Sequence, residues 1–401
     1  MLIGNAVIGQ SGGPTSVINS SLAGVIDTVL EQGCIEKVLG MHGAIQGLME
    51  ERFFDLGAQP KEILKGLRHT PSSALGSSRH KLQDGDFPRV LEVLKKYNIR
   101  YFFIIGGNDT MDTVHRVEAY CKEQGYELRG IGIPKTVDND LYGTDHTPGF
   151  SSAGRYNALS VMQGGQLARD MKQVDQFVVF QTIGRDAGWL AAATACARKR
   201  PDDAPHLIYC PERSFNAEEF IADAKACIEK HGWVSVVVSE GLKYENGLPV
   251  SAAQSKDAFN NTEFGAMGGA SVGLNVHKML REATGLRGEF QIIESLNMSA
   301  IDRATPGDLE EAYQCGIHAV EKAVQGESGY MVCMRRVSNS PYKIEFKLAP
   351  LSDVAIRAKS MPEDYINDRG NDITEKALDY LKPLIGELPH YVTLEPIYVE
   401  V

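Results

Sequence analysis

The sequence lacks any apolar run of the roughly 18 or more residues that a membrane-spanning helix needs. Its first residues, MLIGNAVIGQSGG, contain neither a basic region nor a cleavable apolar segment. These absences argue against a membrane protein and against a secreted one. We therefore expect a cytoplasmic protein.

A basic excess is also missing. The 401 residues include 52 acidic and 41 basic side chains, for a formal net charge of −11. Nucleic-acid binders normally carry the opposite balance, so no nucleic-acid partner is expected. An anionic small-molecule substrate is compatible with this total only if basic groups gather locally.

Cysteine is scarce and scattered. The seven cysteines are an odd number, and no two of them have the spacing of metal ligands. We interpret them as reduced and mostly buried thiols. The 43% apolar and 23% charged residues are typical of a soluble globular chain that is long enough for two domains.

Short apolar runs alternate with longer segments of helical period, which predicts the α/β class with largely parallel sheets. Most of the runs are continuously apolar, as expected for strands covered on both faces. The expected strands are Ala6–Gly9, Tyr101–Ile105, Gly130–Ile133, Phe177–Ile183, His206–Cys210, Val234–Ser239, Phe290–Ile293 and Tyr330–Met334. Thr305 and Asn216 are expected to cap helices.

Paired glycines follow two of these strands. Gly12 and Gly13 follow the first, and Gly106 and Gly107 precede Asn108, Asp109 and Thr110 after the second. Glycines at the start of a helix let backbone N–H groups approach an anion, so both loops are candidate phosphate cradles. A tight turn or an ordinary helix cap explains either loop singly.

A third strand end carries charged side chains. In the segment GIGIPKTVDNDL, Asp138 and Asp140 lie two residues apart, and Lys135 precedes them. A carboxylate beside a substrate hydroxyl can accept its proton during phosphoryl transfer. An Asx-rich surface turn is the alternative.

Two arginines are candidates for contacting a phosphoryl group. Arg79 lies in the polar segment LGSSRHKL, and Arg185 follows Ile183 and Gly184 at the end of a predicted strand. Singly, each is equally explained as a surface ion-pair partner.

Taken in order, these motifs resemble the phosphofructokinase family, and in particular its pyrophosphate-dependent branch. The resemblance implies a phosphofructokinase fold of two Rossmann-like three-layer domains, with the active site in the cleft between them and assembly as a homodimer or homotetramer. It also implies small-molecule substrates. The motifs are GQSGGPTSVIN, LGSSRHKL, IIGGNDT, PKTVDNDL with GTDHTPGF, TIGRDAGWLAAA, VVVSEGLK and GDLEEAYQCG.

The resemblance implies a role for each matching residue. Asp138 is implied as the catalytic base, with Arg79, Lys135 and Thr136 as further catalytic groups. The donor is implied to contact Gly12, Gly13, Gly107, Asn108, Asp109, Thr110 and Lys135. The acceptor is implied to contact Thr136, Asp138, Asp140, Ile183, Gly184, Arg185, Glu240, Glu289 and Met298.

Donor choice is inferred from two positions. ATP-using relatives have glycine where this chain has Asp109 and Lys135, and the pyrophosphate-using branch has aspartate and lysine. A carboxylate repels the inner phosphate of a nucleotide, and a lysine attracts compact pyrophosphate. We expect pyrophosphate as donor with Mg²⁺ as cofactor. Asn108 replaces the usual aspartate near the metal, so Asn108 or Asp109 is expected to hold it, directly or through water.

The acceptor site departs from the family pattern. Relatives that use fructose 6-phosphate have arginines at the positions of Glu289 and Met298, and a proline-glycine pair at Ile293 and Glu294. Either other basic residues such as Arg287 or Arg303 compensate, or the acceptor is an unphosphorylated sugar or polyol. A catalytically silent regulatory homologue is the alternative from another class.

The domain boundaries are also predicted. Residues 1–140 with roughly 270–325 are expected to form the donor domain, and residues 141–269 the acceptor domain. Residues 326–401 are expected to form an extension that packs on the second domain.

Overall fold

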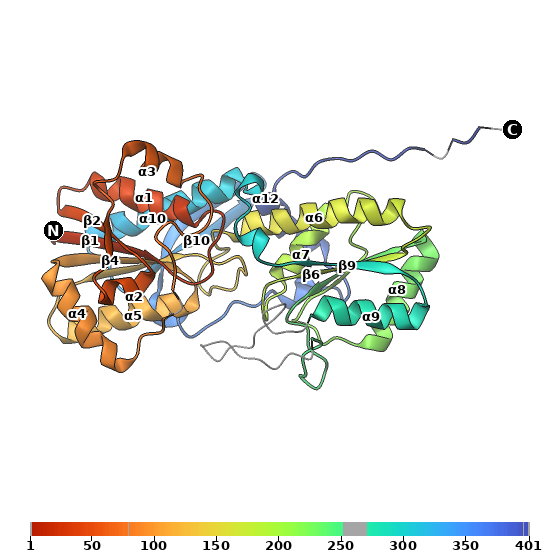
Figure 1. Cartoon of the computed structure of the whole chain (residues 1–401), viewed down its shortest axis with the longest axis horizontal. Helices are drawn as coiled ribbons and strands as arrows, with labels where there is room; N and C mark the ends of the chain where they lie inside the picture. The colour runs from red at the N-terminus through yellow and green to blue at the C-terminus, as the bar shows by residue number, and fades with distance from the viewer. Residues whose placement is uncertain (1, 79, 252–270, 396, 400–401) are drawn as a thin grey trace.

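The computed structural model describes the whole chain except residues 1, 79, 252–270, 396 and 400–401. Two lobes lie side by side, and each is built on its own sheet with helices on both faces (Figure 1). The architecture confirms the predicted α/β class.

The first sheet has seven strands in the order β11-β10-β5-β4-β1-β2-β3. The neighbours from β10 to β2 run parallel, and β3 and β11 are antiparallel edges. The strands are β1 (Gly4–Gln10), β2 (Ile35–Met41), β3 (Phe53–Asp55), β4 (Ile99–Gly106), β5 (Arg129–Pro134), β10 (Tyr330–Asn339) and β11 (Tyr342–Pro350).

The second sheet has four parallel strands in the order β7-β8-β6-β9. Its strands are almost wholly buried except β9, which forms one edge and is largely exposed along its outer residues. The strands are β6 (Phe177–Thr182), β7 (Leu207–Tyr209), β8 (Val234–Ser239) and β9 (Gly288–Ile293).

Helices cover both faces of each sheet because alternate side chains of every buried strand point to opposite faces. In the first lobe, α1 and α10 pack on one face and α4 and α5 on the other. The helices are α1 (Ile18–Leu30), α2 (Ala44–Met49), α3 (Lys61–Leu67), α4 (Phe87–Lys96), α5 (Asn108–Glu123), α6 (Phe150–Asp170), α7 (Trp189–Ala193), α8 (Ala217–His231), α9 (Val272–Thr284), α10 (Pro306–Val324), α11 (Leu351–Val354) and α12 (Glu375–Ile385).

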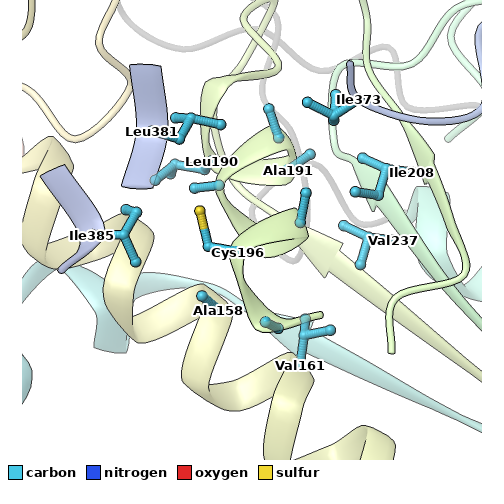
Figure 2. Close-up of a cluster of buried hydrophobic side chains, with 14 of the residues drawn as sticks. Ala158, Val161, Leu190, Ala191, Cys196, Ile208, Val237, Ile373, Leu381 and Ile385 are labelled. Atoms are coloured by element: carbon cyan, nitrogen blue, oxygen red, sulfur yellow. The ribbon is translucent and has the colours of Figure 1, made fainter. Parts of the chain in front are cut away.

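The core of the second lobe depends on small residues. Figure 2 shows Ala191 and Cys196 on the short helical segment between α6 and the sheet, with Leu381 and Ile385 of α12 close by. Alanines let this segment approach the sheet closely, and the space that remains is filled by Ile208 and Val237.

The expected strands and caps are confirmed. Each predicted run overlaps an observed strand, and the side chains of Thr305 and Asn216 accept backbone hydrogen bonds at the starts of α10 and α8. Three strands were not predicted. Glu36 and Lys37 interrupt the apolar run of β2, β3 is only three residues long, and β11 alternates between charged and apolar residues.

The sheets divide the chain differently from the predicted boundaries. Strand β9, which was expected in the donor domain, instead joins the second sheet, and helix α9 precedes it. A crossover helix usually returns the chain to the sheet of the strand before it. Strands β10 and β11 extend the first sheet, whereas α12 packs on α6 and α7 of the second lobe. The expected extension on the second domain is therefore wrong for residues 330–350.

All seven cysteines are free, and six of them are buried. This agrees with the prediction that the cysteines are reduced and mostly buried thiols. Among the described residues, no helix is both long and apolar enough to cross a membrane.

Helices α1 and α10 pack with almost no space between their backbones. A Cβ atom on Gly24 would lie 2.1 Å from the carbonyl oxygen of Tyr313. We expect Gly24→Ala to lower the free energy of unfolding by about 1 to 3 kcal/mol, because the helices must separate to admit the methyl group. Urea unfolding measures this change.

The matched control is Gly307→Ala, in the first turn of α10, where an added Cβ meets nothing within 4 Å. This variant is expected to keep or slightly increase stability, because alanine favours helix over glycine. Equal effects of the two substitutions would show that close packing at Gly24 is unimportant.

Candidate active site

The first half of the candidate site lies where three neighbouring strands end. β5, β4 and β1 are adjacent and parallel, so their carboxyl ends lie along one edge of the first sheet. The N–H of Lys135 donates to the carbonyl of Gly106 (3.0 Å), and the N–H of Ser11 donates to that of Ile105 (2.9 Å). Both glycine loops and the charged segment are therefore brought together, as the sequence predicted.

Lys135 is the cation at this edge. Its side chain is buried, and its Nζ donates to the carbonyl oxygen of Gly13 at 2.5 Å. Gly12 has a left-handed backbone (φ +76°), and a Cβ there would lie 3.4 Å from the same Nζ. Burial lowers the pKa of Lys135 to about 8, although Asp138 and Asp140 act in the opposite direction.

Asp138 and Asp140 follow in the next turn. Burial and the carboxylate of Asp140 raise the pKa of Asp138 to about 6, while Arg185 and Lys135 partly oppose the rise. Burial also raises the pKa of Asp140. The backbone N–H of Asp138 donates to Oγ1 of Thr136 at 3.1 Å, which fixes the turn between the two residues.

The second half of the site comes from the other sheet. β6 and β8 end side by side at Thr182 and Ser239, and the loops that follow carry Arg185 and Glu240. The N–H groups of Gly184 and Arg185 donate to Oε1 of Glu240 at 3.1 and 2.9 Å. Burial raises the pKa of Glu240 to about 7.

Arg185 has an exposed side chain and a left-handed backbone (φ +53°). It shares an electrostatic interaction with Lys135, Asp138 and Asp140 of the other lobe, so the two halves face one another. Ile183 and Gly184 lie beside it at the end of β6. The arrangement places an arginine opposite two carboxylates and a buried lysine.

The start of α5 supplies oxygen atoms. Gly107 precedes the helix, Asn108 is its first residue, and Thr110 is buried in its first turn. Nδ2 of Asn108 donates to the carbonyl of Arg357 at 3.2 Å, and Oδ1 of Asn108 is buried without a hydrogen-bond partner. Asp109 is exposed beside it.

These oxygens fit a hard cation such as Mg²⁺, which commonly takes one or two protein ligands together with phosphate oxygens. Within the described part of the chain, no group of three histidine, cysteine, aspartate or glutamate side chains forms a closed metal site. The fit is therefore to a metal that is shared with a bound phosphate.

The remaining predicted site residues are Arg79, Met298 and Glu289. Arg79 lies outside the described residues. Met298 does lie at the site, since its methyl carbon would be 2.7 Å from a Cβ on Gly13. Glu289 does not: it is exposed and pairs with Val178 near the start of β6, at the opposite end of the sheet from Thr182.

The position of Glu289 contradicts the prediction that this residue contacts the acceptor. Within a single chain, this carboxylate is too far along β9 to repel a phosphate at the carboxyl end of the sheet. Arg287, a suggested replacement cation, lies at the same distant end and pairs with Asp175. Arg303 instead stacks over the ring of Tyr156 at 4.7 Å. Within a single chain, Arg287 therefore does not take over the missing contacts.

Lys359 was not predicted as a site residue. Its Nζ donates to Oδ1 of Asn139 (2.9 Å) and to the carbonyl of Asp145 (2.6 Å), and its N–H donates to the carbonyl of Asp140 (2.7 Å). Burial lowers its pKa to about 7. No local pattern reveals this residue, because its partners are more than 200 positions away in the sequence.

Comparison with known proteins places this geometry in a family. The family model described as Phosphofructokinase matches residues 5–323. A pyrophosphate–fructose 6-phosphate 1-phosphotransferase of Halomonas elongata is 37% identical, over 95% of this chain and 91% of its own. A sulfofructose kinase of Alkalicoccus urumqiensis is 32% identical, over 90% of this chain and 92% of its own.

A solved structure agrees with these relatives. The crystal structure of a pyrophosphate-dependent phosphofructokinase from Nitrosospira multiformis has a TM-score of 0.87 and 37% identity, and the match covers 98% of this chain and 95% of that one. The predicted fold is confirmed. The chain belongs to the phosphofructokinase family.

Proposed function

We propose that this protein is a pyrophosphate-dependent phosphotransferase that moves a phosphoryl group from pyrophosphate to a sugar hydroxyl. Fructose 6-phosphate is the first candidate acceptor, because the relative from Halomonas elongata is named for that substrate. The observation that carries the proposal is Asp138, a partly exposed carboxylate whose pKa is raised to about 6 and which interacts electrostatically with both Lys135 and Arg185.

Each residue has a distinct task. Asp138 accepts the proton of the acceptor hydroxyl, and a pKa of about 6 leaves it largely ionised at neutral pH while it still binds a proton readily. Lys135, the glycine loops and the first turn of α5 bind the donor. Arg185 faces the reacting groups from the other lobe. Glu240 hydrogen-bonds hydroxyl groups of the sugar in this proposal.

Asn108 and Asp109 would hold Mg²⁺, which when bound supplies positive charge to pyrophosphate oxygens. The exposed carboxylate of Asp109 also disfavours the larger polyphosphate of a nucleotide. Asp109 and Lys135 support pyrophosphate rather than ATP as the donor.

A second acceptor class deserves a test. Met298 follows the carboxyl end of β9 and stands where relatives that use fructose 6-phosphate have an arginine. Glu294 replaces the glycine of their proline-glycine pair and adds a negative charge nearby. Arg287 pairs with Asp175, and Arg303 stacks over Tyr156. An unphosphorylated sugar or polyol would avoid the repulsion. The name of the sulfofructose kinase relative shows that acceptors vary among similar proteins.

Assembly as a homodimer or homotetramer, and a cytoplasmic location, are proposed from the sequence. Leu167, Met171 and Val174 support a self-associating surface, because all three are about half exposed near the end of α6.

The pH profile tests the proposed base. kcat/KM should fall tenfold per pH unit below about 6, as Asp138 gains a proton, and should fall again above about 8, as Lys135 loses one. Asp138→Asn should lower kcat by roughly 100-fold or more and remove the acid limb. Asp368→Asn, at an exposed position, is the control and should change neither. An unchanged rate in Asp138→Asn would exclude this base.

Lys135→Met tests the donor site. Removal of one charge-assisted contact costs about 1.5 to 3 kcal/mol, so kcat/KM for pyrophosphate should fall roughly 10- to 100-fold. Lys347→Met, in an exposed ion pair on β11, should leave it unchanged. A wild-type protein that uses ATP and ignores pyrophosphate would overturn the donor assignment.

A panel of acceptors separates the remaining alternatives. Pyrophosphate consumption is measured with fructose 6-phosphate, a sulfonated analogue, free sugars and polyols, and the products are identified by phosphorus NMR. A low-micromolar KM with high turnover for fructose 6-phosphate would exclude the unphosphorylated acceptor. No consumption with any acceptor would favour a catalytically silent homologue.

A further inference from the structure

A buried charged cluster lies behind the loop that carries Asp138. At its centre is His146, which has no exposed surface. Its Nδ1 is 2.8 Å from Oδ2 of Asp145, and its Nε2 is 2.7 Å from Oε2 of Glu311. The Tyr342 hydroxyl lies 3.4 Å from the same Nε2. Ionised carboxylate oxygens only accept hydrogen bonds, so an imidazolium that carries hydrogen on both nitrogens donates to both carboxylates at once.

Two further side chains donate hydrogen bonds to these carboxylates. Arg336 donates from Nε and Nη2 to the same oxygen of Asp145, at 3.0 and 2.9 Å. The hydroxyl of Tyr342 donates to Oε1 of Glu311 at 2.6 Å. Although burial alone would lower the pKa of His146, Glu311 and Asp145 raise it to about 8.

The cluster connects several parts of the chain. His146 and Asp145 belong to the loop after β5, Glu311 to α10, Arg336 to β10 and Tyr342 to β11. The carbonyl of Asp145 also accepts from the Lys359 ammonium (2.6 Å) and from the Tyr380 hydroxyl of α12 (2.8 Å). Elements of both lobes thus hold one short stretch of loop.

This stretch is tied directly to the reacting groups. The hydroxyl of Thr147, the next residue after His146, donates to the carbonyl of Thr136 at 2.8 Å. Thr136 also forms an isolated bridge with Gly149. Oγ1 of Thr136 in turn accepts from the N–H of Asp138. A shift of His146 would therefore move Thr136 and Asp138.

We propose that His146 is a positioning residue that, as an imidazolium held between Asp145 and Glu311, fixes the loop of Thr136 and Asp138 in its reactive position. It contacts no substrate. The inference rests on the proposed phosphotransfer function, because the loop it holds carries the proposed base. Buried ion clusters are often no more stabilising than apolar packing, so a positioning role explains this one better than stability does.

His146→Gln tests the proposal, with His318→Gln on the same helix as Glu311 as the matched control. A misplacement of about 1 Å is enough to lower a rate roughly 100-fold, so kcat should fall about 10- to 100-fold in His146→Gln with little change in KM for pyrophosphate. The control should keep the wild-type kcat. A folded His146→Gln protein with kcat within about twofold of wild type would overturn the proposal.

The double variant His146→Gln with Glu311→Gln separates positioning from stability. It removes the carboxylate that the single variant leaves buried without the imidazolium, so thermal stability should be regained while kcat stays low. Recovery of kcat together with stability would show a merely structural role and overturn the proposal.

Nitrogen NMR of the histidine side chains tests the charge state in the wild-type protein, whether or not the variants fold. One imidazole should be doubly protonated at pH 7 and titrate near 8, and Tyr342→Phe should shift its signals. A neutral His146 at pH 7 would overturn the inference. A wild-type protein inert toward pyrophosphate would instead overturn the proposed function, so the two failures are distinguishable.

Discussion

The site depends on the burial of Lys135 between two glycine loops. A buried ammonium group is costly unless opposite charges and hydrogen-bond acceptors lie close to it. The carbonyl of Gly13 and the carboxylates of Asp138 and Asp140 meet this requirement. The geometry of the loops after β1, β4 and β5 follows from it, because each must bring its atoms to the same point.

The same burial makes the groups chemically useful. Removal from water raises the pKa of Asp138 and lowers that of Lys135, so both values move toward neutrality from opposite sides. A base and a cation that function near neutral pH can therefore lie next to one another. In the neighbouring cluster, the carboxylates outweigh burial and raise the pKa of His146 above its usual value.

Much of the fold was predictable because the core strands are continuous apolar runs. The Tyr101–Ile105 run and the paired glycines after it led directly to β4 and the start of α5. β2 and β11 were not predictable in this way, because both carry charged residues that face water. The predicted domain assignment was wrong for β9, β10 and β11, because which sheet a strand joins depends on contacts that no local pattern records.

The sequence alone identified the candidate residues of the site: the glycine loops, Lys135, Asp138, Asp140, Arg185 and Glu240 all lie in motifs that resemble those of the phosphofructokinase family. The tertiary structure decided which of the implied residues meet. It brought Met298 against Gly13 and placed Glu289 at the far end of its sheet. It also brought Lys359, Glu311 and Tyr342 to a loop that is distant from them in the sequence. Residue type and spacing specify local backbone and charge, whereas proximity across the chain arises only when the sheets and helices pack.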